Sequence, residues 1–103
     1  MHQLVVFVPE SHAEKVKEAC FEAGAGRYKN YDCCCFESSG SAQFRALEGA
    51  EPFIGSIGKI EKVGELRIEM ICEDECIASV CDAIRRTHPY EEPAFHFVAF
   101  ASF

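Results

Sequence analysis

The stretch "ELRIEMIC", Glu65 to Cys72, alternates apolar with charged residues in the middle of the chain. Successive side chains of a β-strand point to opposite faces, so every second residue shares a face. Alternation of this kind is typical of a strand with one face on the core and the other in contact with solvent. It predicts a half-buried strand whose apolar side consists of Leu66, Ile68, Met70 and Cys72.

The residues before this strand predict a further strand followed by a helix. "QLVVFV", residues 3–8, is apolar at nearly every position, which indicates a strand inside a sheet and covered on both faces. Ser11 and Glu14 have the spacing of a capping box, and apolar residues then recur at helical spacing up to "GAG". A helix is therefore expected over residues 11–23.

Residues 31–64 predict a hairpin followed by an inserted segment. "YDCCCFE", residues 31–37, is interpreted as a strand, and "SSGS", residues 38–41, as the turn that leads into "AQFRAL". Residues 48–64 carry four glycines and one proline, which favours a long loop or a loose ribbon. The inserted ribbon is expected over about residues 40–64.

The C-terminal part of the chain predicts a second helix and a last strand. Asp74 is in position to cap the helix, and its buried stripe is Ile77, Val80, Cys81 and Ile84. "HPYEEP", residues 88–93, ends the helix with two prolines. "AFHFVAF", residues 94–100, is then the last strand.

The order of the elements predicts the fold class. A β-α-β unit, an inserted β ribbon and a second β-α-β unit give an α+β, ferredoxin-like domain over residues 1–103, with an antiparallel sheet and both helices on one face. The first and last strands are apolar on both alternating sides, so the helix-free face also needs a cover. Other copies of the chain would supply it, which predicts a homo-oligomer.

Composition excludes several classes of protein. The 103 residues are 49% hydrophobic, enough for one domain with one core. A formal net charge of −7 opposes binding to nucleic acid, and no apolar run is long enough to span a membrane. Seven cysteines, three of them contiguous, suit a reduced chain, and the first residues do not read as a secretion signal, so we expect a cytoplasmic protein.

Three long stretches resemble one protein family. "GAGRYKNYD", "GSAQFRALEGAEPFIGSIGKIEKVGELRIEM" and "HPYEEPAF" are similar to the inserted PII/CutA-like domain of the YqfO (Nif-three-like, NGG-interacting factor) family. The resemblance implies a stand-alone PII/CutA-like domain that forms a trimer, with the ribbon where PII proteins carry an effector-responsive loop. The family's dinuclear metal site lies in two flanking lobes that have no counterpart in these residues, so its proposed hydrolase activity is not carried over.

The cysteines leave two alternatives open. On adjacent antiparallel strands Cys33 would lie near Cys72, with Cys35 and Cys76 close by, and such thiolates suit Cu or Zn. Free cysteine also behaves as a small hydrophobe, which is the interpretation for Cys20, Cys34 and Cys81 and the alternative for the other four. Cys34 is expected beneath the helices, with Cys33 and Cys35 on the other face.

Other candidate ligand or partner contacts lie in three motifs. His88, Tyr90, Glu91 and Glu92 of "HPYEEP" offer metal ligands or acid–base groups, or else form a rigid exit from the helix. Arg45 and Glu48 of "FRALEGA" form an ion pair or hold a ligand. "GAGR", residues 24–27, follows a helix and is interpreted as a helix stop rather than an anion cradle.

The predicted function is a non-enzymatic, oligomeric binding or regulatory module whose intersubunit clefts hold a small ligand, an ion or a partner protein. The alternative is a CutA-like divalent-metal or copper-binding (metal tolerance) protein that uses Cys and His. An enzyme is disfavoured because no Ser-His-Asp spacing, Walker loop or HExxH motif occurs.

Overall fold

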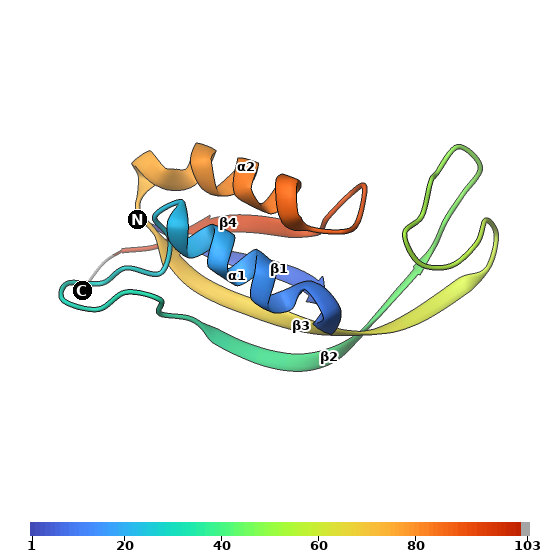
Figure 1. Ribbon diagram of the computed structural model, residues 1–103, viewed down its shortest axis with the longest axis horizontal. Helices are drawn as coiled ribbons and strands as arrows, with labels where there is room; N and C mark the ends of the chain where they lie inside the picture. Colours follow the sequence, from blue (N-terminus) through green and yellow to red (C-terminus); the bar gives the residue numbers. More distant parts are fainter. Residues whose placement is uncertain (102–103) are drawn as a thin grey trace.

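A four-stranded antiparallel sheet carries two α-helices in the computed structural model, which describes residues 1–101 (Figure 1). The strand order is β2-β3-β1-β4, so β1 lies inside the sheet as expected. This is the ferredoxin-like α+β arrangement, and that prediction is confirmed. The elements are β1 (His2–Pro9), α1 (Ala13–Glu22), β2 (Phe36–Arg45), β3 (Ile60–Cys72), α2 (Ile77–Thr87) and β4 (Phe95–Ala99).

The core lies between the helices and one face of the sheet. Directly paired residues of antiparallel strands share a face, so Val6 of β1 and its partner Ile68 of β3 both point toward the helices. Both are fully buried, as are Val16 of α1 and Ile84 of α2. Burying side chains of this size contributes about 1.5–3 kcal/mol each. No helix in the described range is both long and apolar enough to cross a membrane.

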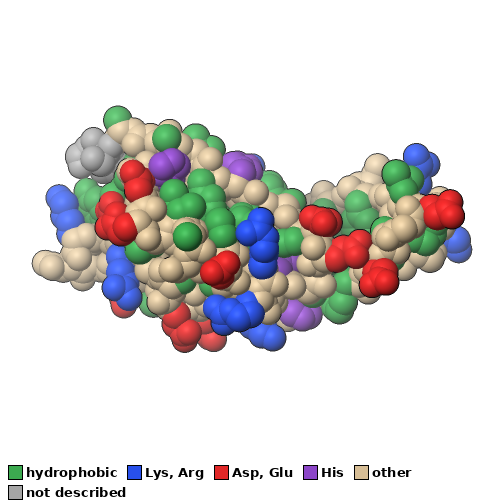
Figure 2. All heavy atoms as spheres, turned by 90° about the horizontal axis from the view of Figure 1, so that it is seen from above, with side chains coloured by type: hydrophobic (Ala, Val, Ile, Leu, Met, Phe, Trp, Pro, Cys, Tyr) green, Lys and Arg blue, Asp and Glu red, His purple; other side chains and the backbone are tan. Residues whose placement is uncertain are grey.

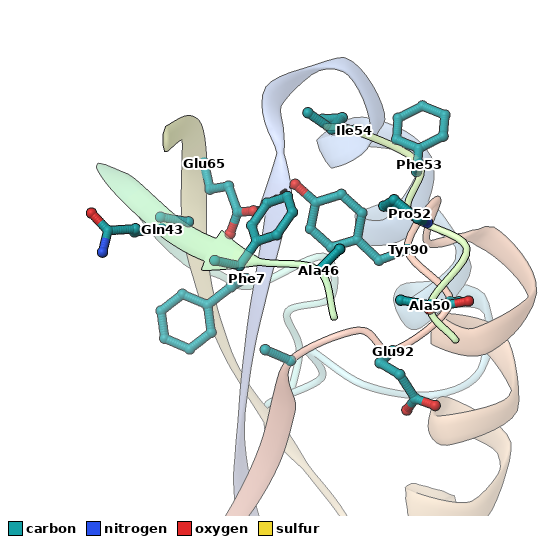
Figure 3. Close-up of a pocket in the computed structure, with 14 residues that line it drawn as sticks. Phe7, Gln43, Ala46, Ala50, Pro52, Phe53, Ile54, Glu65, Tyr90 and Glu92 are labelled. Atoms are coloured by element: carbon teal, nitrogen blue, oxygen red, sulfur yellow. Dashed lines mark hydrogen bonds between the residues drawn. The ribbon is translucent and has the colours of Figure 1, made fainter. Parts of the chain in front are cut away.

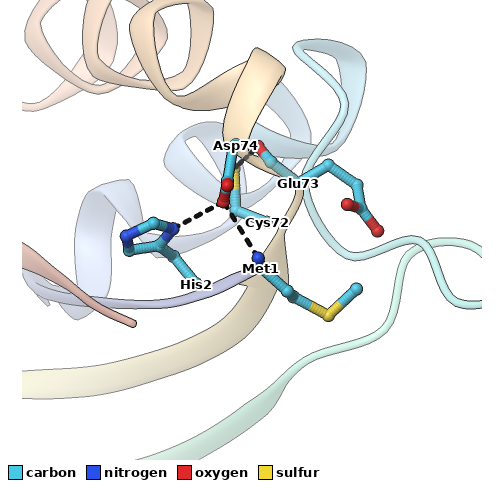
Figure 4. A network of polar contacts seen from close by, with 5 residues as sticks. All are labelled: Met1, His2, Cys72, Glu73 and Asp74. Carbon is cyan, nitrogen blue, oxygen red and sulfur yellow. Dashed lines mark hydrogen bonds and ion pairs between the residues drawn. The ribbon is translucent and has the colours of Figure 1, made fainter. Parts of the chain in front are cut away.

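Both helices start differently from the prediction. Each is preceded by a short 3₁₀ turn, Glu10–His12 and Asp74–Cys76, and neither has a side-chain cap. The Asp74 carboxylate instead accepts hydrogen bonds from the Met1 amino group at 3.0 Å and from His2 Nδ1 at 2.7 Å (Figure 4). Those two bonds hold the pKa of Asp74 below its ordinary value. The capping-box prediction at Ser11 and the predicted cap at Asp74 are therefore wrong.

The predicted hairpin turn at "SSGS" is also wrong. Residues 38–41 lie inside β2, which pairs without interruption with β3 from Phe36 opposite Glu69 to Arg45 opposite Ile60. Pairing to a long neighbouring strand holds these turn-prone residues extended, because tertiary context overrides a weak local preference. The far ends of β2 and β3 project from the sheet as a ribbon, and a loop of residues 46–59, here called the ribbon loop, joins them (Figure 1).

Residues 31–35, predicted as strand, form a loop. Tyr28 and Tyr31 pair with each other across a tight turn, and Cys33 has a left-handed φ of 56° that ends any extended run. Gly26 anchors this loop: its N–H donates to Ile71 O and its carbonyl accepts from Cys34 N, both at 2.8 Å. Its φ of 74° is a conformation that glycine adopts without strain.

The helix-free face of the sheet is apolar in part. Phe36 of β2 and Val5 of β1 occupy the same transverse row on this face, since both are paired with Glu69. Val5 is buried, but Phe36 is 67% exposed, and Val98 of β4 on the same face is 49% exposed. The sheet therefore presents unburied apolar side chains on the side that no helix covers.

Candidate functional site

A pocket of about 310 Å³ lies where the ribbon loop folds back toward residues 88–93, here called the HPYEEP turn. Figure 3 shows Tyr90 in the middle of this pocket, with Pro52 and Phe53 of the ribbon loop on one side. The lining residues are Phe7, Ala42, Gln43, Phe44, Ala46, Ala50, Pro52, Phe53, Ile54, Glu65, Tyr90, Glu91, Glu92 and Ala94.

Tyr90 holds the pocket together. Its hydroxyl donates a hydrogen bond of 2.8 Å to Oε2 of Glu65, at the base of the ribbon. Its ring centroid lies 6.0 Å from that of Phe44 and 6.4 Å from that of Phe53, both tilted contacts of the kind aromatic pairs prefer. Burial, followed by the bond to Glu65 and the charge of that carboxylate, raises the pKa of Tyr90.

His88 lies beneath Tyr90 and positions it. As predicted, His88 ends α2: its backbone N–H donates to Ile84 O at 2.8 Å. Its Nε2 donates to Phe7 O at 2.7 Å, so its Nδ1 is left to accept the Tyr90 N–H at 3.2 Å. Burial lowers the pKa of His88 from 6.5, although the Phe7 bond and the Glu65 charge oppose that change. His88 is therefore a neutral structural group and does not line the pocket.

Glu91 joins the HPYEEP turn to the ribbon loop. Both of its carboxylate oxygens lie within hydrogen-bond distance of the Glu51 N–H, at 3.1 and 3.2 Å. Phe53 of the same loop also touches the body of the protein, with its ring centroid 5.6 Å from that of His12. Glu92 lines the pocket with an exposed carboxylate. Within the described residues, the loop is thus held to the body by the bond from the Glu51 N–H to the Glu91 carboxylate and by the ring contacts of Phe53.

The site is acidic. Three glutamates line the pocket, and within residues 1–101 its lining includes no lysine, arginine or histidine. Figure 2 shows acidic side chains gathered where the ribbon meets the two-helix body. A negatively charged ligand would therefore be repelled from this part of the molecule.

Arg45 and Glu48 lie outside the pocket. Arg45 ends β2 and Glu48 lies in the ribbon loop, and both are exposed. The described residues contain no ion pair between them, so the structure does not bring these two candidates together within one chain. Their predicted role in holding a ligand or another subunit stays a prediction.

The cysteines fall into two separate groups. Cys33 and Cys35 are exposed in the loop before β2, whereas Cys72 is 1% exposed and belongs to the core. Burial raises the pKa of the Cys72 thiol to about 11 and that of Cys20 to about 12, which keeps both protonated at neutral pH. No three His, Cys, Asp or Glu side chains between residues 1 and 101 group closely enough to hold a metal ion. Cu or Zn binding by these cysteines stays a prediction without geometric support.

Cys34 does not occupy the predicted place beneath the helices. It lies in the loop, half-buried, with its Sγ 3.6 Å from Asp32 O. The prediction assumed the alternating faces of a strand, and the left-handed backbone at Cys33 removes that alternation. Cys76, the fourth predicted ligand, packs half-buried against the core, and Cys20 is buried as expected.

Sequence reasoning missed several residues of the pocket. The sequence pattern indicates only the start of a strand at Glu65, and it assigns no site role to Phe7, Phe44 or Phe53. A signal existed in Tyr90, because a half-buried tyrosine hydroxyl normally needs a hydrogen-bond partner. The sequence offers many carboxylates, however, and only the register of β3 against β1 places Glu65 at this position, opposite Pro9.

Comparison with known proteins gives the family context. No family model matches this chain. The "GTP cyclohydrolase 1 type 2 homolog" of Mycobacterium tuberculosis is 45% identical over 95 residues, or 92% of this chain and 25% of that protein. The crystal structure of a Bacillus cereus protein related to NIF3 superposes with a TM-score of 0.84 at 39% identity, over 98% of this chain and 26% of that one. The chain is homologous to one segment of the NIF3-related proteins.

This homology confirms the resemblance seen in the motifs. A second NIF3-related relative, the GTP cyclohydrolase 1 type 2 homolog of Halalkalibacterium halodurans, is 44% identical over 99% of this chain and 27% of its own length. The chain thus spans about a quarter of the length of the curated relatives it matches. The periplasmic divalent cation tolerance protein CutA of Archaeoglobus fulgidus shares the fold, with a TM-score of 0.71 at 21% identity over 100% of this chain and 87% of that one.

Proposed function

We propose that this chain is a non-enzymatic binding or regulatory module, and that its ligand occupies the pocket between the ribbon loop and the HPYEEP turn. The pocket itself is the observation that carries the proposal. Its volume of about 310 Å³ falls at the lower end of the range for small-molecule sites, and its walls are mostly apolar with a few convergent polar groups.

The residues around the pocket support binding rather than catalysis. Within the described range the lining contains no Ser, Cys, Lys or His that could act as a nucleophile or a proton shuttle. The hydroxyl of Tyr90 is engaged with Glu65, and both oxygens of Glu91 face a backbone amide. These groups shape the pocket and fix the loop over it.

The ribbon loop suits a regulatory role. It carries exposed apolar side chains, with Leu47 67% and Phe53 55% exposed, and among residues 1–101 it makes few contacts with the body. A ligand that fills the pocket would add contacts to both the loop and the turn. Binding would therefore order the loop and change the surface that it presents to a partner.

The same proposal includes a homo-oligomer, and a trimer is its expected form. Phe36 and Val98 on the helix-free face support it, because apolar side chains on an uncovered sheet face are typical of a subunit contact. Light scattering coupled to size exclusion tests this. Val98→Asp is expected to lower the mass of the particle, while Ala78→Asp on the exposed side of α2 leaves it unchanged. A wild-type chain that elutes as a monomer would remove this part of the proposal.

A pocket-filling variant tests the binding function. Thermal-shift screening of amines, sugars, nucleotides and divalent ions is expected to yield at least one compound that raises the Tm of the wild-type protein. Ala50→Phe places a ring inside the pocket and should abolish that rise, whereas Ala78→Phe on exposed α2 should retain it. Stabilisation that survives Ala50→Phe would show that the ligand binds elsewhere.

A further inference from the structure

We propose that the pocket selects a small organic cation, namely a protonated amine carried on an apolar body of about one ring. This inference rests on the binding function proposed above and adds the chemical class of the ligand. Three features of the pocket carry it: the sign of its charge, its aromatic walls, and the one open oxygen of a buried carboxylate.

The charge of the pocket excludes anions and favours cations. Glu65, Glu91 and Glu92 line it, and no basic side chain does so in the described residues. Two imidazole rings lie beside the lining: His88, 5.0 Å from the Tyr90 ring, is neutral at pH 7 because burial lowers its pKa, and His12 lies 5.6 Å from the Phe53 ring. Phosphates and carboxylates would thus meet only like charge, while a protonated amine would meet an attractive potential.

The walls of the pocket supply faces that bind cations. Phe44, Phe53 and Tyr90 all line it. The ring centroid of Tyr90 lies 6.0 Å from that of Phe44 and 6.4 Å from that of Phe53. A cation within about 6 Å of a ring centroid is attracted by the negative face of that ring. The same rings cover the apolar body of the ligand, and Pro52 and Ile54 extend that apolar surface.

Glu65 provides the partner for the amine. The residue is 6% exposed, and in the described part of the chain its carboxylate has one hydrogen bond, from Tyr90 to Oε2. In this range every side-chain oxygen that lacks a partner keeps some exposed surface, so Oε1 of Glu65 is open to solvent, and Glu65 is one of the residues that line the pocket. A carboxylate can accept several hydrogen bonds, and a charged N–H donor forms the strongest of them.

A matched series of probes tests the inference on the full chain. The test is an NMR titration with 2-phenylethylamine, 2-phenylethanol and phenylacetate. Each has a phenyl ring on a two-carbon chain, and at neutral pH they are a cation, a neutral molecule and an anion. The amine is expected to bind at millimolar concentration with shifts in Tyr90 and Phe53. It should bind about tenfold more tightly than the alcohol, and phenylacetate should not bind.

Carboxylate variants separate charge recognition from pocket shape. Glu65→Gln should weaken the amine about tenfold and leave 2-phenylethanol unchanged, because the amide keeps the shape and the bond to Tyr90 but loses the charge. If Glu65→Gln fails to fold, Glu92→Gln is the second variant: it removes an exposed charge of the lining and should weaken the binding of the amine while leaving that of 2-phenylethanol unchanged. Glu18→Gln, which removes an exposed acid of α1 outside the pocket, is the control and should leave all three affinities unchanged.

The outcomes distinguish this inference from the function on which it rests. Alcohol or phenylacetate binding as tightly as the amine, blocked by Ala50→Phe, would overturn the cation preference and leave the binding function standing. An equal loss of amine and alcohol binding in Glu65→Gln would assign Glu65 a role in shape alone and would also overturn it. If none of the three probes binds, the cation site is refuted, while the wider thermal-shift screen decides the binding function separately.

Discussion

The hydrogen bond between Tyr90 and Glu65 should be the main polar contact that stabilises the pocket. Tyr90→Phe keeps the ring and its contacts with Phe44 and Phe53, and removes only the hydroxyl that lies 2.8 Å from Oε2. Hydrogen bonds to charged groups contribute about 1.5–3 kcal/mol. Since water can still reach one oxygen of the largely buried Glu65 carboxylate, we expect the lower end, a loss of about 1.5 kcal/mol in the free energy of unfolding.

Urea denaturation at a fixed protein concentration measures this loss, because the stability of an oligomer depends on concentration. Tyr31→Phe is the matched control: Tyr31 is 73% exposed, so its hydroxyl should contribute less than about 0.5 kcal/mol. In a Glu65→Gln background the bond is neutral, and Tyr90→Phe should cost only about 0.5–1 kcal/mol. Equal losses for Tyr90→Phe and Tyr31→Phe would refute the reasoning.

Three further predictions concern the core and its loops. The free energy of unfolding should fall as the pH drops below about 6.5. Burial lowers the pKa of His88 in the folded protein, so this histidine binds a proton at a higher pH in the unfolded chain than in the folded one. Denaturation of His88→Gln over the same pH range should show a shallower fall. Gly26→Ala should lower the free energy of unfolding by about 2–4 kcal/mol, because φ is 74° and the new Cβ would lie 2.8 Å from Phe21 and 2.9 Å from Cys34 O. Gly40 has open space around it, so Gly40→Ala is the control and should leave the melting temperature almost unchanged. In thiol labelling of the native protein, Cys33 should react within the mixing time and Cys72 only on unfolding; equal rates would contradict the core placement of Cys72.

The strands and helices that pack on the core could be predicted because their side chains repeat with the period of the element. β1, β4 and both helices lie within a few residues of their predicted ranges, since burial against a common core requires that period. β3 ends at Cys72 as predicted, but it begins at Ile60, inside the segment predicted as a loop or loose ribbon. The helix starts could not be predicted. Ser11 and Asp74 fit capping patterns, but Ser11 Oγ pairs with His12 Nδ1, and Asp74 binds groups 72 residues away or more.

The region from residue 27 to residue 45 shows where local patterns fail. A serine- and glycine-rich tetrapeptide favours a turn, yet pairing with β3 keeps residues 38–41 extended. Three cysteines beside aromatic residues favour a strand, yet the positive φ of Cys33 and the anchor at Gly26 make the segment a loop. In both cases the deciding contact comes from Gly64–Ile71 of β3, far along the chain, so no local window contains it.

The α+β class, the order of the elements, the acidic charge and the likeness to NIF3-related proteins could be predicted from the residues alone, because each follows from local periodicity, composition or contiguous motifs. Which side chains form the site depends on how the chain folds. Tyr90, Glu65 and Phe53 lie at least 12 positions apart along the chain, and they meet because strand register sets Glu65 at the base of the ribbon while the ribbon loop folds back over the HPYEEP turn. Register and loop closure depend on contacts between distant segments, and those contacts are settled by the free energy of the whole fold rather than by any one stretch of residues.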